Sequence, residues 1–111
     1  MDVQLKRGLL DICVLKTLRE EDSYGYKIVR DLSSHMKISE STLYPILKRL
    51  EQGQLLTVYM MEHTGRLRKY YHITTAGKER IEAFLEEWHE VENIVAYIKG
   101  GSENDENGIS Q

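Results

Sequence analysis

The sequence predicts a mainly α-helical protein with one small β-hairpin and a long C-terminal helix. Three observations predict this fold class. Apolar residues recur every three or four positions up to Gly53, the spacing of helices that bury one face. Two runs rich in β-branched and aromatic residues follow, with a glycine between them, as in a hairpin. From Thr74 the helical spacing returns and continues to Lys99.

The length of 111 residues suits one domain with its own core. We expect a folded domain over residues 1–74 and a separate helix over residues 75–99. Residues 100–111 are polar, acidic and contain glycines, so we expect a disordered tail there.

The composition excludes several classes of protein. No apolar run approaches the roughly 20 residues that span a bilayer, and the N-terminus has no signal-peptide pattern. The single cysteine, Cys13, rules out an intrachain disulfide and a multi-cysteine metal site, and we expect it to be a small core residue. We expect a cytoplasmic protein that contacts no membrane, needs no cofactor or metal, and is not an enzyme. The four histidines lack metal-ligand spacing, and there is no phosphate loop or nucleophile elbow.

Charge is unevenly distributed along the chain. Residues 1–74 carry a net charge of +3 and residues 75–111 a net charge of −6, within a total of −3. A basic front and an acidic rear suit a protein that approaches nucleic acid with one side.

The first predicted helix covers residues 3–19. Between Leu9 and Leu15 only Asp11 is polar, so apolar residues point almost all the way round. Such a helix is buried on more than one side. A second subunit is a plausible second burying surface.

Two shorter helices follow. Ser23 is the expected N-cap of a helix over residues 24–32, and Ser39 that of a helix over residues 39–51. Pro45 conflicts with the latter, since a proline inside a helix costs about 3 kcal/mol. The cost shrinks if the helix effectively begins at Ser41 or Thr42, which places Pro45 in its first turn.

The helix over residues 39–51 has two distinct faces. Leu43, Ile46, Leu47 and Leu50 form its buried stripe. The opposite face is hydroxyl-bearing, aromatic and basic, with no acid between Glu40 and Glu51. It carries Ser41, Tyr44, Pro45, Lys48 and Gln52, flanked by Thr42 and Arg49. This face suits a DNA major groove, although an ordinary amphipathic helix with a mildly basic face is the alternative.

The predicted hairpin pairs residues 55–62 with residues 69–74. Its tip, His63–Arg68, contains a glycine and two arginines. Tyr70 and Tyr71 point to opposite faces of a strand, so one of them should be core. Two short helices followed by such a hairpin form a winged helix-turn-helix, with the hairpin as the wing.

The last predicted helix carries an apolar seam. Ile81, Phe84, Trp88, Val91, Val95 and Ile98 follow one another at spacings of three and four residues, with Leu85 and Ile94 beside them. A small winged helix does not need the whole of this seam for its own core. We therefore expect a C-terminal dimerisation helix, with packing on its own domain as the alternative.

Several segments, in this order, resemble the PadR family of bacterial transcriptional regulators. They are Ser23–Tyr26, Ser41–Glu51, Gly65–Arg66, Arg68–Tyr71, and Ile73–Thr74 ahead of Gly77. The resemblance covers residues 3–99, and the short chain is similar to the compact subfamily that includes multidrug-sensing repressors. It implies a homodimeric repressor, dimerised through the first and last helices. Such a protein binds a palindromic operator in double-stranded DNA and releases it when a small aromatic, phenolic or drug-like molecule binds.

The resemblance also implies roles for individual residues. The DNA contacts would be Tyr24, Lys27, Ser41, Thr42, Tyr44, Pro45, Lys48, Arg49, Arg66, Arg68 and Lys69. The dimer interface would contain Leu5, Leu9, Ile12, Ile81, Phe84, Trp88, Val91, Val95 and Ile98. The ligand would bind at Trp88, with Leu85 and Leu9.

Other interpretations stay open. In these interpretations, Tyr44 props its helix as a half-buried aromatic, the basic tip is a solvated loop, and Trp88 is a core or interface residue. A winged-helix dimer that acts in protein–protein interaction without ligand sensing is the alternative function.

Overall fold

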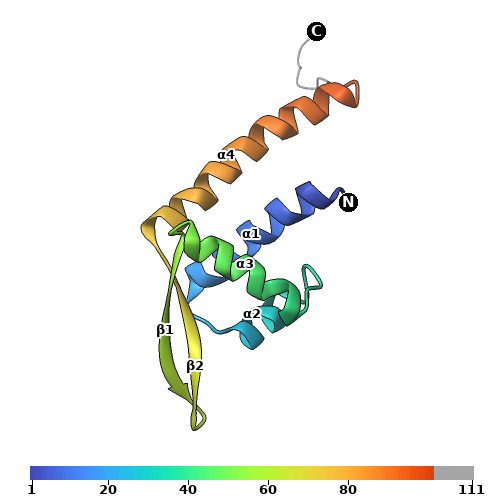
Figure 1. The fold of residues 1–111 in the computed structure, drawn as a ribbon. Helices are drawn as coiled ribbons and strands as arrows, with labels where there is room; N and C mark the ends of the chain where they lie inside the picture. Colours follow the sequence, from blue (N-terminus) through green and yellow to red (C-terminus); the bar gives the residue numbers. More distant parts are fainter. Residues whose placement is uncertain (102–111) are drawn as a thin grey trace. The chain divides into compact units, whose positions relative to one another are not determined.

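The structure, a computed structural model, describes residues 1–101, so the tail expected over residues 100–111 lies almost entirely outside the described residues. Its elements are α1 (Val3–Glu20), α2 (Gly25–Leu32), α3 (Glu40–Gln52), β1 (Leu56–His63), β2 (Arg66–Ile73) and α4 (Thr75–Ile98) (Figure 1). The chain forms two compact units, Met1–Ile81 and the part from Glu82 onward. No helix within residues 1–101 is long and apolar enough to cross a membrane.

The first unit has one apolar core to which all its elements contribute. Its fully buried apolar side chains are Val14, Leu15, Leu18, Ile28, Leu43, Leu47, Leu56 and Ile81. The predicted stripe of α3 is confirmed, since Leu43, Ile46, Leu47 and Leu50 are all buried. Cys13 is half-buried against this core, and burial raises the pKa of its thiol.

α1 is buried on more than one side within its own unit. It buries Leu10, Ile12, Val14, Leu15 and Leu18. Leu5 remains exposed and Leu9 half-buried. Much of the burial expected from a second subunit is therefore supplied by the first unit itself.

The expected capping role of Ser23 is wrong. The residue before α2 is Tyr24, which makes no side-chain cap bond. Ser23 instead forms an isolated β-bridge: its N–H donates to the carbonyl of Tyr71 at 3.3 Å, and its own carbonyl accepts from the Tyr71 N–H at 2.8 Å. A local capping pattern cannot reveal a partner that lies in another element of the chain.

α3 begins where Ser39 caps it, because the Ser39 Oγ accepts from the Thr42 N–H at 3.2 Å. Pro45 therefore lies in the second turn and not in the first. Since Pro45 has no N–H, the Ser41 carbonyl lacks its intrahelical donor. Both residues are exposed, so water can satisfy that carbonyl and the cost of the proline is reduced.

The wing is a regular antiparallel hairpin with a tight turn. Leu56 pairs with Ile73 at one end and His63 with Arg66 at the other. The turn consists of Thr64 and Gly65 alone, with φ values of 51° and 78°. Two left-handed residues in succession match the right-handed twist of the strands.

The predicted tip was too long, and the burial of its strand was underestimated. Arg66 and Arg68 lie within β2, and both Tyr70 and Tyr71 are buried. Tyr71 packs in the core. Tyr70, on the other face of the strand, is covered by the rings of Tyr24 and Tyr59, whose centroids lie 5.3 and 5.7 Å away.

α4 begins after Thr74, as predicted. The Thr74 Oγ1 accepts from the Gly77 N–H at 3.0 Å and donates to the Gln54 carbonyl at 2.9 Å, which ties the start of the helix to the loop between α3 and β1. Ile81 is its last core residue. In the second unit, Phe84 stacks on Trp88 with ring centroids 5.9 Å apart.

Candidate DNA-binding surface

The N-terminal end of α3 presents three hydroxyl side chains close together. The Ser39 Oγ lies 2.9 Å from the Ser41 Oγ and 3.1 Å from the Thr42 Oγ1. All three residues are exposed. They can donate to phosphates or base edges beside the first N–H groups of the helix.

The predicted outer face of α3 is confirmed as an exposed face. Ser41, Tyr44, Pro45, Lys48 and Gln52 are all exposed. Within residues 1–101 no carboxylate lies within ion-pair distance of the Lys48 Nζ. Its charge is therefore available to an anion.

Tyr44 stands on α3 with its ring held against α2. Its hydroxyl donates to a Glu40 carboxylate oxygen at 3.0 Å, and a Cβ placed at Gly25 would lie 2.5 Å from the Tyr44 Oη. Only a glycine at position 25 leaves the ring in this place. Burial, then the Glu40 hydrogen bond, raises the pKa of Tyr44, so its hydroxyl stays protonated.

Arg68 on β2 is held in place by aromatic contacts. Its guanidinium carbon lies 4.9 Å from the centroid of the Tyr24 ring, a cation–π distance. Tyr24 in turn contacts the His63 and Tyr70 rings, with centroids 5.2 and 5.3 Å away. Among the described residues the buried Arg68 Nε has no hydrogen-bond partner.

These side chains meet around an open hollow of about 630 Å³ between α2, α3 and the wing. Its lining residues are Tyr24, Gly25, Tyr26, Glu40, Tyr44, Arg66, Arg68, Lys69 and Tyr71. Five of the predicted DNA-contacting residues line this hollow: Tyr24, Tyr44, Arg66, Arg68 and Lys69. Ser41, Thr42, Pro45 and Lys48 are exposed elsewhere on α3.

Sequence reasoning missed Tyr26, Gly25 and Glu40 at this hollow. Tyr26 is 55% exposed, and its position two residues after Tyr24 gave no signal of its own. Gly25 is needed because the Tyr44 ring of α3 lies against it, and a contact between two helices leaves no local pattern in the sequence. Glu40 places one carboxylate beside the cations, so the surface is not purely basic.

Two predicted DNA contacts are engaged elsewhere. Arg49 is hydrogen-bonded and ion-paired to Asp11 of α1. The Lys27 Nζ lies 2.8 Å from a Glu21 oxygen and 3.1 Å from an Asp31 oxygen, and it lines a different hollow between α1 and α2. Neither residue lines the hollow between α2, α3 and the wing.

The wing is tied to the segment between α1 and α2 by Asp22. The Tyr59 hydroxyl donates to one Asp22 oxygen at 2.7 Å, and the His72 Nδ1 lies 2.8 Å from the other. Burial of Asp22 opposes ionisation, but the hydrogen bonds from Tyr59 and His72 outweigh it, and the pKa of Asp22 is lowered. The hydrogen bond to Asp22 is also the main reason why the pKa of Tyr59 is raised to about 12.

The residues predicted for the dimer interface and the ligand fall into two groups. Ile12 and Ile81 are buried in the first unit, so they have little surface left for a partner. On α4, Trp88, Val91, Val95 and Ile98 are between 36% and 71% exposed, and Leu85 is 51% exposed. An open groove on this helix is lined by Trp88, Val91, Glu92, Val95, Ala96, Lys99 and Gly101.

Within residues 1–101 no group of three or more His, Cys, Asp or Glu side chains is arranged to hold a metal ion. Two short helices, the second with an exposed polar face, and a wing carrying cations define a winged-helix protein. Residues 14–83 match the family described as "Transcriptional regulator PadR-like family". The chain belongs to this family, and it is accordingly a transcriptional regulator and not an enzyme.

Known proteins agree with this assignment. A PadR family transcriptional regulator from Eggerthella lenta DSM 2243 has a similar structure, with a TM-score of 0.78 and 34% identity, over 89% of this chain and 88% of the other. The Mycobacterium tuberculosis protein "Transcriptional regulator Rv3488" is 29% identical over 88% of this chain and 90% of its own. Bacillus subtilis PadR, solved in complex with operator DNA, matches with a TM-score of 0.62 and 26% identity, over 68% of this chain and 46% of that one.

Proposed function

We propose that this chain is a dimeric, sequence-specific repressor that binds a two-fold symmetric operator through α3 and the wing. The observation that carries the proposal is the arrangement of Arg66, Arg68 and Lys69 around one hollow with Tyr44 of the exposed α3 face. Support comes also from the operator complex of the related Bacillus subtilis PadR.

Arg68 is the residue best prepared for a phosphate. A buried N–H without a partner costs about 1–3 kcal/mol, and a phosphate oxygen would remove that cost. Because the Tyr24 ring already orients the guanidinium, little side-chain freedom is lost on binding. Arg66 and Lys69 are exposed beside it and add charge.

α3 divides into a part that reads bases and a part that anchors. Ser41, Thr42 and Tyr44 lie in its N-terminal half, from which base contacts usually come. Lys48 lies toward the C-terminal half and would bind a phosphate. Two further cations would act indirectly. Arg49 would hold α3 against α1 through Asp11. Lys27 would hold α2 against the preceding segment through Glu21.

α4 is the proposed dimerisation element. A run of exposed apolar side chains along one helix is costly in water, and a second copy would cover it. The seam from Phe84 to Ile98 has the spacing of a coiled coil. Leu5 and Leu9 on α1 are the remaining candidates for this interface.

The inducer would bind at the same interface. Trp88 already stacks on Phe84 and lines an open groove, so a planar aromatic molecule could stack on the Trp88 ring of each subunit. Leu85 and Leu9 are the proposed apolar neighbours. Since Trp88 is the only tryptophan, titration of planar aromatics followed by fluorescence tests this role directly. A diverse panel that leaves the emission unchanged contradicts it.

The DNA proposal is tested by fluorescence anisotropy at several salt concentrations. The duplexes are the region upstream of the chain's own gene and a shuffled duplex of equal length. We expect Arg68→Ala to weaken binding to both duplexes and to reduce the salt slope by about one, because one phosphate contact is lost.

Lys78→Ala is the matched control, since it removes one exposed cation in the first turn of α4. It should leave the affinity and the slope unchanged. An Arg68→Ala slope equal to that of the unaltered protein removes Arg68 from the contacts. If neither duplex binds at low salt, a winged-helix dimer used for protein–protein interaction becomes the better description.

A further inference from the structure

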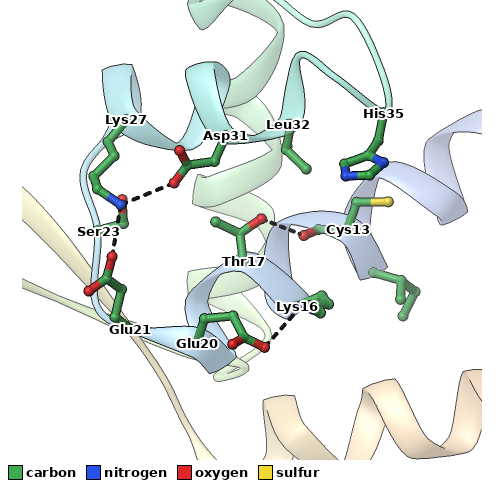
Figure 2. A pocket seen from close by; sticks show the side chains of 11 residues that line it. Cys13, Lys16, Thr17, Glu20, Glu21, Ser23, Lys27, Asp31, Leu32 and His35 are labelled. Carbon is green, nitrogen blue, oxygen red and sulfur yellow. Dashed lines mark hydrogen bonds and ion pairs between the residues drawn. The ribbon is translucent and has the colours of Figure 1, made fainter.

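A second hollow lies between α1 and α2, away from the wing cations. It measures about 450 Å³ and is lined by Ile12, Cys13, Lys16, Thr17, Glu20, Glu21, Ser23, Lys27, Asp31, Leu32 and His35 (Figure 2). We propose that this hollow binds a small, neutral, mostly apolar molecule that carries one hydrogen-bonding oxygen, and that the Ser23 hydroxyl is its polar contact. This site is separate from the α4 seam and does not depend on DNA binding.

Ser23 supplies the observation that points to a ligand. The residue is 1% exposed, and among the described residues its Oγ has no hydrogen-bond partner. Its backbone is fixed by both hydrogen bonds of the bridge to Tyr71, so the residue as a whole is held at the wall of the hollow. Buried hydroxyls are normally paired, and an oxygen of a bound molecule would pair this one.

The middle of the hollow is apolar. Ile12 and Leu32 are buried core residues that reach its wall, and the Thr17 hydroxyl is occupied because it donates to the Cys13 carbonyl at 3.0 Å. Thr17 therefore presents its methyl group. A volume of about 450 Å³ falls in the usual range of small-molecule sites, which combine apolar walls with a few placed polar groups.

The charges at the rim are already paired with one another. The Lys16 Nζ lies 2.9 Å from a Glu20 oxygen, and the Lys27 Nζ bridges Glu21 and Asp31. A charged ligand would have to break these pairs, so a neutral one is favoured. Three carboxylates against two lysines further disfavour an anion.

The positions of the lining residues indicate at which end of the hollow the ligand oxygen would lie. In Figure 2, Ser23 lies next to Lys27 and Glu21 at one end, and Cys13 and His35 lie at the other. Lys27 covers the Ser23 end with a long side chain whose partners are on the surface. A ligand oxygen placed at this end would pair with the Ser23 Oγ while the apolar body rests on Thr17 and Leu32.

Benzyl alcohol and toluene form a matched pair of probes, because they differ by the hydroxymethyl group in place of a methyl. Binding to the full chain is followed by NMR through the methyl groups of Ile12, Thr17 and Leu32. We expect saturable shifts with both probes and an affinity for benzyl alcohol about three- to tenfold higher, the value of one net hydrogen bond.

Ser23→Ala should reduce the affinity for benzyl alcohol to that for toluene and leave toluene binding unchanged. The variant should fold, because it removes a hydroxyl without a partner and keeps the backbone bridge. Ser34→Ala, an exposed serine in the turn after α2, is the control and should change neither affinity.

Three results overturn the proposal. The first is the absence of saturable shifts at Ile12, Thr17 and Leu32 up to the solubility limit of benzyl alcohol. The second is a preference for benzyl alcohol that survives Ser23→Ala. The third is a set of shifts confined to α4, or shifts that follow the protein concentration alone, since a second copy of the chain then occupies the hollow.

Discussion

Lys48 and Arg49 are neighbouring cations on α3 with different surroundings. The Lys48 side chain is exposed, whereas Arg49 forms an ion pair with Asp11, whose side chain is only 15% exposed. The Arg49 pair joins α3 to α1. Loss of one member of a partly buried pair leaves the other charge poorly solvated.

We therefore predict that substitution by methionine lowers stability at Arg49 and weakens DNA binding at Lys48. Arg49→Met should lower the free energy of unfolding by about 1–2 kcal/mol, measured by urea denaturation. Lys48→Met should leave stability within about 0.5 kcal/mol and should weaken DNA binding with a smaller salt slope. Equal stabilities of the two variants would show that the Asp11 pair contributes nothing.

Asp22 makes the attachment of the wing dependent on pH. Because its pKa is lowered in the folded protein, its ionised form stabilises the fold above its ordinary pKa of 3.8, and that contribution is lost as the pH falls through the folded value. Asp22→Asn should be less stable than the unaltered protein by a constant amount between about pH 5 and pH 7. The gap should narrow below about pH 4.

Urea denaturation at a series of pH values measures this gap. Asp31→Asn is the control, since it removes a carboxylate that pairs with Lys27 and not with a residue of the wing. A gap between the unaltered protein and Asp22→Asn that stays constant down to pH 2 would contradict the assignment.

At the residue scale, the sequence predicted which side chains of α3 are exposed better than it predicted which residues interact with one another. The outer face of α3 followed from periodicity, which is local. The partner of Arg49, the bridge of Ser23 and the burial of Tyr70 depend on elements far along the chain, and no local pattern records them. Gly25 lies within the segment Ser23–Tyr26 that resembles the family, but the reason for a glycine there, the closeness of the Tyr44 ring, appears only when α2 and α3 are packed together.

At the scale of elements, the start of α4 is locked against the base of the wing. Gly77 is buried in the first turn, and a Cβ there would lie 2.3 Å from the Leu55 carbonyl oxygen and 2.7 Å from the Ile73 Cγ1. One of these neighbours is backbone and cannot move cheaply. Helix propensity and packing thus make opposite demands at this position.

Two glycine-to-alanine substitutions distinguish the effect of packing from the effect of helix propensity. Gly77→Ala should destabilise the protein by about 1–3 kcal/mol because of overpacking. Gly8→Ala, within α1 and with nothing within 4 Å of the added Cβ, should stabilise it by up to about 1 kcal/mol. Thermal unfolding at one protein concentration compares the two. A stabilising Gly77→Ala would mean that the close approach to Leu55 is absent.

The elements themselves were largely predictable. Helices show in the spacing of apolar residues, and the hairpin shows in its β-formers around Gly65. The expected six-residue tip was too long because Thr64 adopts a left-handed conformation that β-branched residues seldom take, and this allows a two-residue turn. The start of α3 was open in the sequence and is settled by the Ser39 cap.

At the scale of the whole molecule, the exposed seam of α4 predicts the state of association. Val95→Glu should convert a dimer into a monomer, because a carboxylate would be buried against an apolar partner. Asn93→Glu adds the same charge to the same helix away from the seam and should remain dimeric. Light scattering coupled to size-exclusion chromatography gives the two masses, and a dimeric Val95→Glu would exclude this seam as the interface.

The acidic side chains of α4 have a consequence for how salt acts on this protein. In the proposed dimer, Glu87 and Glu92 would flank the seam, so each of the two copies would bring the same negative charges to the junction. Added salt would screen that repulsion and favour pairing, while it would weaken the proposed contacts of Arg68 and Lys48 with phosphates. The two linked equilibria therefore respond to salt in opposite directions. At protein concentrations near the dimer dissociation constant, operator occupancy should pass through a maximum at an intermediate ionic strength.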